Sequence, residues 1–273
     1  MSMPPRALFR GLFDDAAMFP PGNASAEAAL AGHLRLRRSW FAGLVGPLLV
    51  SARSWDDFVR AHEDADAPEV AVVLIGTTSA PAGVPETVAL MGLEVAVTDV
   101  PLPDVPAATS LAAEITLGPA GDRVLAAIGD AADPRLLAKF RTGGTTADAF
   151  PSQDVLASVI CRAVAVQAPF KLTAGLHHAV RHTGQATGFE HHGFLNVIAA
   201  VSRALSGADG DAVAEALAGR HSAPLVAEIR ELTAEQVRDV RESFVSFGCC
   251  GVEDPVGDLV ELGLVDPDPE ELE

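Results

Sequence analysis

Only two lysines occur in this chain, Lys139 and Lys171, beside seventeen arginines. A lysine can lose its proton and react as an amine, whereas an arginine stays charged. A lysine that persists in such an arginine-rich chain is therefore a candidate for amine chemistry. The alternative is that both lysines survive by chance at the surface.

Both lysines lie in short β-rich runs, at residues 136–141 and 170–174. Side chains alternate along a strand, so Lys139 shares a face with Arg141, and Lys171 shares a face with Thr173. Neighbouring strands lie about 4.8 Å apart. If the two runs are adjacent strands, both ammonium groups can therefore point into the same interior.

Two ammonium groups at this range repel each other, and partial burial adds to the cost of the charge. Both effects lower the pKa of one lysine and leave a free amine near neutral pH, as a Schiff-base catalyst requires. The alternative is a pair of structural lysines that neutralise carboxylates in the core. Glu114 shares a strand face with Thr116 and is a natural partner for Lys139 if that face points inward.

The segment 177–192 holds five of the eight histidines and follows the run that contains Lys171. Histidines there could act as general acids and bases, or could hold zinc or manganese together with a glutamate. They could also be polar side chains at a helix start with no catalytic role. No spacing matches a zinc signature, so acid/base chemistry without a metal cofactor is favoured. The expected catalytic groups are His177 and His178, and the expected substrate-binding groups are Glu190, His191 and His192.

Asp14 and Asp15 follow an apolar run at residues 7–13 and precede a Pro-Pro-Gly turn. If that run is a strand, the acid pair lies at the mouth of the site, where it could bind substrate or supply a base. Alternatively, the two acids cap a helix that begins near residue 16. Cys249 and Cys250 could include a nucleophile, but small residues packed at the mouth are favoured, because no thiolate-stabilising neighbour is evident.

Eight β-rich runs alternate with helical or turn-rich stretches, which indicates a mainly parallel sheet. The runs are residues 7–13, 47–51, 70–75, 93–98, 113–117, 136–141, 170–174 and 244–247. Eight runs favour an α/β fold of the (β/α)8 TIM-barrel type over an open, doubly wound sheet. No dinucleotide-binding or phosphate-binding glycine motif supports the open sheet. Helices are expected at residues 24–44, 54–63, 122–131 and 152–166.

One region departs from simple alternation. Residues 191–243 contain two or three helical patterns, and we expect them to form an insertion after the seventh strand, in a position suited to a lid. Residues 266–273 form an acidic C-terminal tail. We therefore expect residues 1–273 to form a single barrel domain.

The composition sets limits on location and partners. The chain has 273 residues, of which 49% are hydrophobic and 21% charged, and its net charge is −18. This charge disfavours nucleic acid and anionic membranes as partners, since both need a basic face. No run approaches 18 apolar residues, three cysteines are too few for a disulfide framework, and no secretory core precedes the first acids. A cytoplasmic, reduced protein is expected, and it could be a homo-oligomer.

Three segments resemble a known family. LLAKFRTGG, PFKLTAGLHH and FVSFGCCG are similar to the last three strands of deoxyribose-phosphate aldolase and its class I aldolase relatives. That family carries Lys-Thr-Ser-Thr-Gly, Lys-x-x-Gly-Gly and Phe-Gly-x-Ser-Ser type motifs there. AEITLG is similar to the fifth-strand pattern with its buried glutamate. The resemblance implies that Lys139 forms the Schiff base and that Lys171 lowers its pKa.

The chain departs from the family at the phosphate site. The family has a glycine pair after strand seven and a serine pair after strand eight, where this chain has Ala174-Gly175 and Cys249-Cys250. The terminal tyrosine of some members has no counterpart, because the chain contains no tyrosine. For the family's proton-moving aspartate on strand four, the chain offers only Asp99.

An anion site can still form after the sixth strand. Arg141 supplies a guanidinium, and the turn that follows supplies backbone N–H groups, so a carboxylate is expected rather than a phosphate. The expected substrate-binding residues here are Arg141, Thr142, Gly143, Gly144 and Thr173.

Together these patterns predict a Schiff-base-forming lyase or aldolase that acts on a small carbonyl compound without an organic cofactor. The carbonyl would condense with Lys139, and Glu114, Asp99 or His177 would move protons. One alternative is a metal-dependent lyase or hydrolase centred on segment 177–192. Another is a non-catalytic barrel that serves as a binding subunit.

Overall fold

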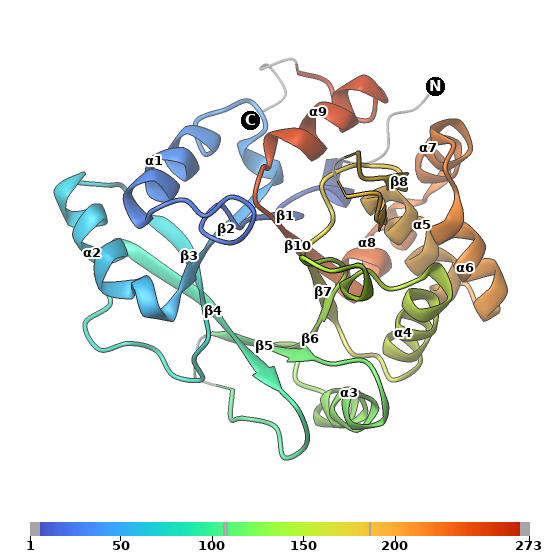
Figure 1. Cartoon of the computed structure of the whole chain (residues 1–273), viewed down its shortest axis with the longest axis horizontal. Helices are drawn as coiled ribbons and strands as arrows, with labels where there is room; N and C mark the ends of the chain where they lie inside the picture. The colour runs from blue at the N-terminus through green and yellow to red at the C-terminus, as the bar shows by residue number, and fades with distance from the viewer. Residues whose placement is uncertain (1–5, 106, 108, 186, 268–273) are drawn as a thin grey trace.

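The computed structural model describes residues 6–105, 107, 109–185 and 187–267. Eight parallel strands close into a barrel in the order β1-β10-β7-β6-β5-β4-β3-β2 (Figure 1). The closed barrel confirms the predicted (β/α)8 architecture. The barrel strands are β1 (Phe13–Asp15), β2 (Val45–Ser51), β3 (Val70–Ile75), β4 (Val88–Val97), β5 (Ser110–Ile115), β6 (Leu136–Arg141), β7 (Phe170–Thr173) and β10 (Phe244–Cys249).

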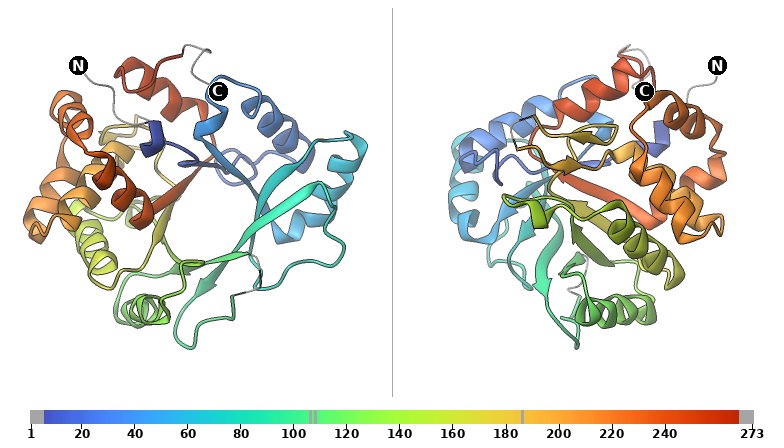
Figure 2. Two further views of the ribbon diagram at one scale, coloured as in Figure 1. Left: turned by 180° about the vertical axis from the view of Figure 1, so that it is seen from behind. Right: turned by 45° about the vertical axis from the view of Figure 1, so that its right-hand side comes forward.

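Helices surround most of the barrel wall, as the two further views in Figure 2 show. They are α1 (Ala26–Leu36), α2 (Trp55–Asp64), α3 (Pro119–Ala131), α4 (Gln153–Ala165), α5 (Phe194–Leu205), α6 (Gly210–Ala218), α7 (Ser222–Glu231), α8 (Ala234–Ser243) and α9 (Glu253–Glu261). None of the helices formed by the described residues is long and apolar enough to cross a membrane.

Two strands are followed by loops instead of helices. In the described part of the chain, no helix lies between β3 and β4 or between β4 and β5. The apolar side chains of Val84, Leu102 and Val105, from these two loops, pack against the main core. The loops thus cover the outer wall of β4, where a regular barrel would have helices.

The first strand lies later in the chain than the sequence suggests. Residues 7–13 are not a strand, because a 3-10 turn spans Arg6–Leu8 and Gly11 adopts a left-handed conformation with φ of +56°. Leu8, Phe9 and Leu12 are all fully buried, so the run packs into the core without the alternation of buried and exposed side chains that a strand would show. As a result β1 contains Asp14 and Asp15 themselves.

Other boundaries also shift. The first helix ends at Leu36 instead of residue 44. Just after this end, the Ser39 hydroxyl donates to the Leu36 carbonyl oxygen at 2.6 Å. β4 begins five residues before the predicted start, and β5 three residues before it. β10 extends two residues further than predicted, to Cys249.

The insertion after β7 is larger than predicted. It begins with a short antiparallel hairpin, β8 (His182–Thr183) and β9 (Glu190–His191), and continues with four helices where two or three were expected. α6, α7 and α8 each pack against the buried α5. Phe194 of α5 lies 5.7 Å from the Phe247 ring of β10, so the insertion is anchored on the barrel wall. It flanks the barrel and does not cover its axis, as Figures 1 and 2 show. Of the predicted acidic tail, residues 268–273 lie outside the described residues.

Candidate active site

The two lysines are direct register partners on adjacent strands. Lys139 of β6 pairs with Lys171 of β7, and Glu114 of β5 pairs with Lys139. On the other side, Lys171 pairs with Ser246 of β10. The predicted alternation therefore places these polar groups in one layer inside the barrel.

A single carboxylate bridges the two ammonium groups. Glu94 of β4 accepts from Lys139 Nζ at 2.7 Å through Oε2 and from Lys171 Nζ at 2.5 Å through Oε1. Lys139 also contacts Glu114 Oε2 at 2.9 Å, and Lys171 contacts Asp14 Oδ2 at 2.6 Å. The lysines are thus linked through carboxylates in the order Glu114, Lys139, Glu94, Lys171, Asp14.

This arrangement corrects the expectation of two unshielded lysines. Burial works to lower the pKa of Lys171, but the carboxylates of Asp14 and Glu94 outweigh it and raise that pKa. Burial likewise opposes the charge on Glu94, yet the two lysines lower its pKa to about 2. Lys171 and Glu94 therefore keep their charges across the physiological range.

Asp14 and Glu114 occupy the two ends of the linked groups and differ in burial. Burial raises the pKa of Asp14 despite its contact with Lys171, so this carboxyl holds a proton more readily than usual. Burial also acts to raise the pKa of Glu114, but Lys139 and Arg141 outweigh it and lower that pKa. The Glu114 side chain is 26% exposed, which makes it the end of the group that meets solvent.

Glu94 is the buried carboxylate beside the lysines that sequence reasoning missed, whereas Asp99 is not brought to the two lysines. Asp99 lies beyond the end of β4, 49% exposed, and pairs with Arg123 of α3 at 2.7 Å. The signal for Glu94 was its position as a lone charged residue within the apolar run LEVAV. A carboxylate is seldom fully buried unless it is paired.

The immediate surroundings hold Asp14 and Arg141 in place. Ser246 Oγ donates to Asp14 Oδ2 at 2.8 Å. Gly46 of β2 has no side chain where a Cβ would collide with Asp14 Oδ1. Arg141 Nε donates to Glu114 Oε1 at 3.1 Å, and its side chain is 55% exposed, so the guanidinium is open to an incoming anion.

The turn after β6 is packed and only partly available to a ligand. Thr142 is 1% exposed, and its hydroxyl donates to the Ala174 carbonyl oxygen at 2.5 Å, which contradicts its expected contact with substrate. A Cβ on Gly143 would lie 2.8 Å from Gly175 Cα, so this glycine permits close packing of two loops. Gly144 is exposed, and Thr173 is half-buried beside Lys171 on the inner face of β7.

Asp15 does not belong to the site, contrary to expectation. It lies on the outer face of β1, where its Oδ2 lies 3.0 Å from His33 Nδ1 of α1. Its Oδ1 accepts from the backbone N–H of Ala17 at 3.1 Å. Asp15 therefore fixes the loop that follows β1, while Asp14 faces the lysines.

The histidines of segment 177–192 have separate surroundings. His177 lies 3.6 Å from the sulfur atoms of both Cys249 and Cys250. The rings of His178, His182 and His191 form a row with centroid separations of 4.8 and 5.0 Å. Within the described residues, no group of three or more histidine, cysteine, aspartate or glutamate side chains could hold a metal ion.

His178 and His191 also have polar partners outside the row. His178 Nδ1 lies 3.3 Å from Asp258 Oδ2, and His191 Nδ1 lies 3.3 Å from the Gly175 carbonyl oxygen. Burial is the main cause of a lowered pKa for His177, which keeps it neutral near pH 7. His177 therefore contacts the end of β10, and His191 contacts the loop that follows β7.

His192 and Glu190 make contacts that hold the hairpin, and neither is brought to the two lysines by a contact of the described residues. His192 is 1% exposed, and its Nε2 lies 2.8 Å from the Pro151 carbonyl oxygen while Arg181 donates to its Nδ1 at 3.3 Å. Glu190 accepts from Thr183 at 2.5 Å and also pairs with Arg181 and Arg220. Both residues therefore fasten the β8–β9 hairpin.

The adjacent cysteines are unsuited to thiolate chemistry. Burial raises the pKa of both Cys249 and Cys250. Cys249 donates to the Gly251 carbonyl oxygen at 3.2 Å. They lie at and just after the end of β10, beside His177.

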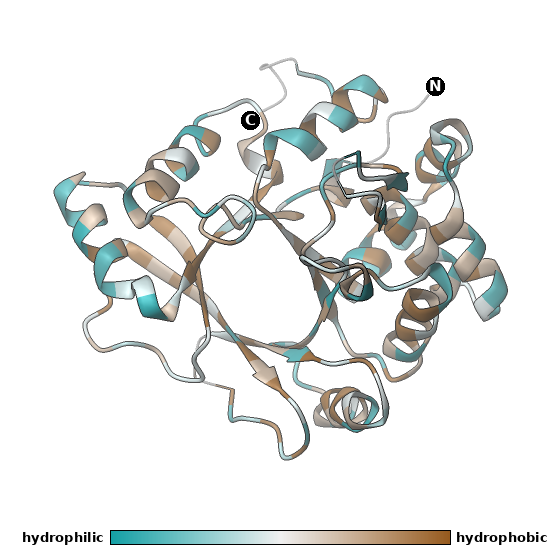
Figure 3. Ribbon diagram, in the orientation of Figure 1, coloured by the Kyte–Doolittle hydropathy of each residue, from teal (hydrophilic) through white to brown (hydrophobic). Residues whose placement is uncertain are grey.

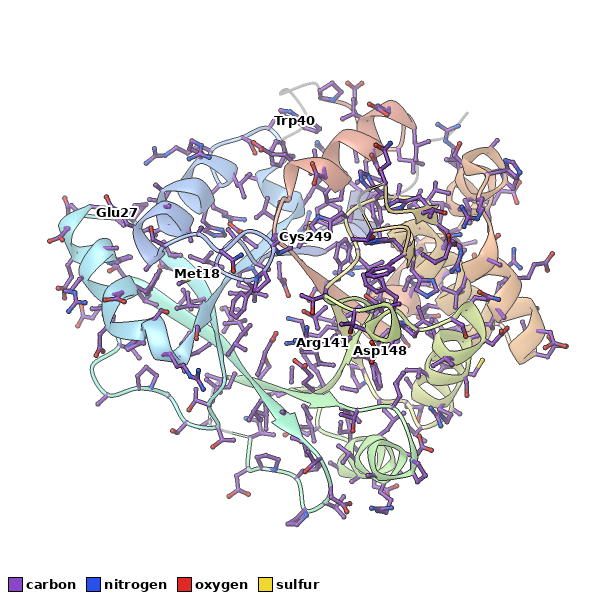
Figure 4. All side chains as sticks on the ribbon, viewed as in Figure 1. Met18, Glu27, Trp40, Arg141, Asp148 and Cys249 are labelled. Atoms are coloured by element: carbon purple, nitrogen blue, oxygen red, sulfur yellow. The ribbon has the colours of Figure 1, made fainter. Side chains whose placement is uncertain are left out.

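The opposite wall of the barrel interior is apolar. Ala16, Leu49 and Val73 form a small cluster separate from the main core, with Phe19 and Ile75 packed against it. Figure 3 shows this contrast, with brown ribbon along β2 and β3 and teal at the end of β5. Figure 4 labels Met18 of the turn after β1, Arg141 of β6 and Cys249 of β10 around the barrel axis.

Comparison of the chain with protein-family models, curated proteins and solved structures finds no match.

Proposed function

We propose that this chain is a lyase of the class I aldolase type, in which Lys139 forms an imine with a small carbonyl substrate. One observation carries the proposal: the only two lysines of the chain meet inside the barrel, bridged by Glu94. Catalytic residues of such barrels lie toward the carboxyl ends of the strands. The resemblance to deoxyribose-phosphate aldolases supports the same assignment, with Glu94 as the carboxylate on strand four.

Lys139 is the better candidate for the nucleophile. Lys171 is held between two buried carboxylates, which stabilise its charge. Lys139 also contacts Glu94, and its second partner is Glu114, which is partly exposed. A proton leaving Lys139 can therefore pass to Glu114 and then to water, whereas Lys171 has no such contact.

The reaction would proceed in balanced steps. Lys139 Nζ gives one proton to Glu114 and attacks the carbonyl carbon, forming a C–N bond. The proton returns, and the former carbonyl oxygen leaves as water, so that ammonium and carbonyl become iminium and water. The iminium then accepts the electron pair of an adjacent C–C or C–H bond. The Lys171–Glu94 pair keeps its geometry throughout, and Arg141 holds the substrate carboxylate.

The test is reductive trapping. The protein is incubated with small aldehydes, ketones and 2-oxo acids, borohydride is added, and the intact mass and modified peptide are determined. We expect an adduct on Lys139. Lys139→Arg, which keeps the charge but cannot form the imine, is expected to abolish it, and the matched Lys171→Arg is expected to retain it. An adduct that survives in Lys139→Arg, or no adduct with any compound, would overturn the proposal.

A further inference from the structure

Exposure does not distinguish the two lysines. The side chain of Lys139 is 3% exposed and that of Lys171 is 5% exposed, and the two residues are register partners on adjacent strands. Access from solvent is therefore no reason for one of them to react in preference to the other. What separates them is the second carboxylate that each contacts, Glu114 beside Lys139 and Asp14 beside Lys171.

Asp14 is fixed against Lys171 by its neighbours. It is 2% exposed, and its Oδ2 accepts from Lys171 Nζ at 2.6 Å and from Ser246 Oγ at 2.8 Å. Gly46 lies so close that a Cβ there would collide with Asp14 Oδ1. Residues of β2 and β10 thus hold the Asp14 carboxylate beside the lysine, whereas the Glu114 side chain is 26% exposed.

The charges of the site balance only while Asp14 is ionised. The site then holds three carboxylates and three cations, which are Asp14, Glu94, Glu114, Lys139, Lys171 and Arg141. If Asp14 loses its charge, three cations face two carboxylates, and burial makes the excess positive charge costly. Arg141 cannot give up its proton, and Lys139 still contacts two carboxylates, so Lys171 is the group that becomes a neutral amine.

We propose that Asp14 selects the nucleophile of this site by keeping Lys171 protonated, and that Lys171 is a second, latent Schiff-base lysine. Asp14 is thus a positioning residue, because it acts through Lys171 and need not touch the substrate. The inference rests on the proposed function, since it requires that a carbonyl compound reach the barrel interior. When Lys171 reacts, its ammonium group and the carbonyl become iminium and water, as for Lys139.

The test locates the lysine that borohydride traps after incubation with pyruvate, acetaldehyde or acetone. It is run at pH 8, to keep Asp14 ionised although burial raises its pKa. We expect the wild-type adduct on Lys139. Asp14→Asn keeps the shape of the side chain but removes its charge. In this variant we expect the ratio of Lys171 adduct to Lys139 adduct, measured by peptide mass spectrometry, to rise at least about tenfold, the lower end of the effect of one close opposite charge.

A gain of reaction provides the sharper readout. Lys139→Arg alone is expected to form no adduct, whereas Asp14→Asn combined with Lys139→Arg is expected to form one on Lys171. Wild-type protein unfolded in urea gives the background of unspecific lysine modification. Asp15→Asn is the matched control, because Asp15 is also 2% exposed but lies beside His33 on the outer face of β1. We expect this control to leave the adduct on Lys139.

A second variant changes the site without altering Asp14 itself. Gly46→Ala pushes the carboxylate away from Lys171 and is expected to raise the same adduct ratio. It keeps the proposal testable if Asp14→Asn fails to fold, which circular dichroism shows.

The outcomes separate the two proposals. If the folded variants at Asp14 and Gly46 leave the adduct on Lys139 alone, the inference is overturned and the imine chemistry of Lys139 stands. A shift in Asp15→Asn as large as that in Asp14→Asn also overturns it. Failure of the wild type to form an adduct with any of the three compounds instead overturns the proposed function.

Discussion

At the scale of single residues, Glu94 decides how the site behaves. It is 1% exposed and accepts from both lysines, so two like charges coexist in the interior only because a carboxylate lies between them. A buried charge pair that loses one member leaves the other uncompensated. Glu94 therefore compensates the positive charges of both lysines.

Glu94→Gln should move the pH dependence of imine formation. Without the carboxylate, the two ammonium groups repel, so a neutral lysine forms at lower pH. We expect the acid limb of the trapping rate to shift downward by about one to three pH units, the usual effect of one close opposite charge. Glu114→Gln is the comparison variant, and we expect a smaller shift because the Glu114 side chain is partly exposed to solvent. An unchanged acid limb, or a shift to higher pH, would contradict the role of Glu94.

Gly46→Ala should disturb Asp14 without touching a lysine. The added Cβ would collide with Asp14 Oδ1, so the carboxylate must leave its contacts with Lys171 and Ser246. We expect a loss of about 1–3 kcal/mol in the free energy of unfolding, typical of overpacking. Gly43→Ala is the matched control, since nothing lies within 4 Å of its added Cβ. Urea denaturation of both variants is the measurement, and equal stability of the two would be evidence against the placement of Asp14.

At the scale of elements, the β8–β9 hairpin is fastened by a buried neutral imidazole. Arg181 donates to Nδ1 of His192, which leaves Nε2 to donate to the Pro151 carbonyl oxygen. Burial is the main cause that lowers the pKa of His192 to about 4. Protonation would place a second positive charge beside Arg181, so acid should release the hairpin.

The stability of the protein should therefore fall as the pH drops. Above pH 6.5, His192 is neutral in both the folded and the unfolded chain; between 6.5 and about 4, only the unfolded chain binds the proton. The unfolded state gains on the order of 3 kcal/mol across this window. We expect His192→Gln to remove that part of the loss in urea titrations at pH 7 and at about pH 4, while the exposed His221→Gln keeps it. A parallel loss in wild type and His192→Gln would refute this assignment.

Alternation along the strands predicted the barrel and the meeting of the two lysines, because both follow from local periodicity. The residues that lie opposite one another on neighbouring strands could not be predicted in the same way, because this register depends on how the whole barrel closes. Glu94 was therefore overlooked and Asp99 preferred, although the latter pairs with Arg123 outside the wall. His192 was expected to bind substrate because its true partners, Arg181 and Pro151, lie in other parts of the sequence and could not be recognised from it. Residues 7–13 were expected to form a strand because a fully buried apolar run does not show the periodicity that distinguishes a strand from a turn.

At the scale of the whole molecule, the net charge of −18 opposes the compact state. Like charges spread over a surface repel one another at low ionic strength, and salt shortens the Debye length from about 30 Å at 0.01 M to about 8 Å at 0.15 M. Asp14 and Glu94 of the candidate site contribute little to this effect, because they are buried and paired with Lys171 and Lys139.

Thermal stability should consequently rise with salt. We expect sodium chloride over this range to stabilise the protein by on the order of 1 kcal/mol, which corresponds to about 2–4 °C in Tm for a chain of this size. Scanning calorimetry at pH 7 is the measurement. Repeating it at pH 5 gives the control, since partial protonation of surface carboxylates should reduce the gain. A Tm that falls with salt would show that attractive surface pairs dominate instead.

Closure of the barrel brings the first strand, β1, and the last strand, β10, together beside the two lysines. Asp14 lies on the first strand, and it contacts Lys171, 157 residues later, and Ser246, 232 residues later. During synthesis on the ribosome, the early part of the chain is exposed long before β10 has been made. Until that strand docks, the sheet has two open edges and Asp14 lacks its Ser246 partner. Under the proposed function, imine formation would therefore begin only when the last strand is in place, and a nascent chain that lacks β10 would be inert toward carbonyl compounds.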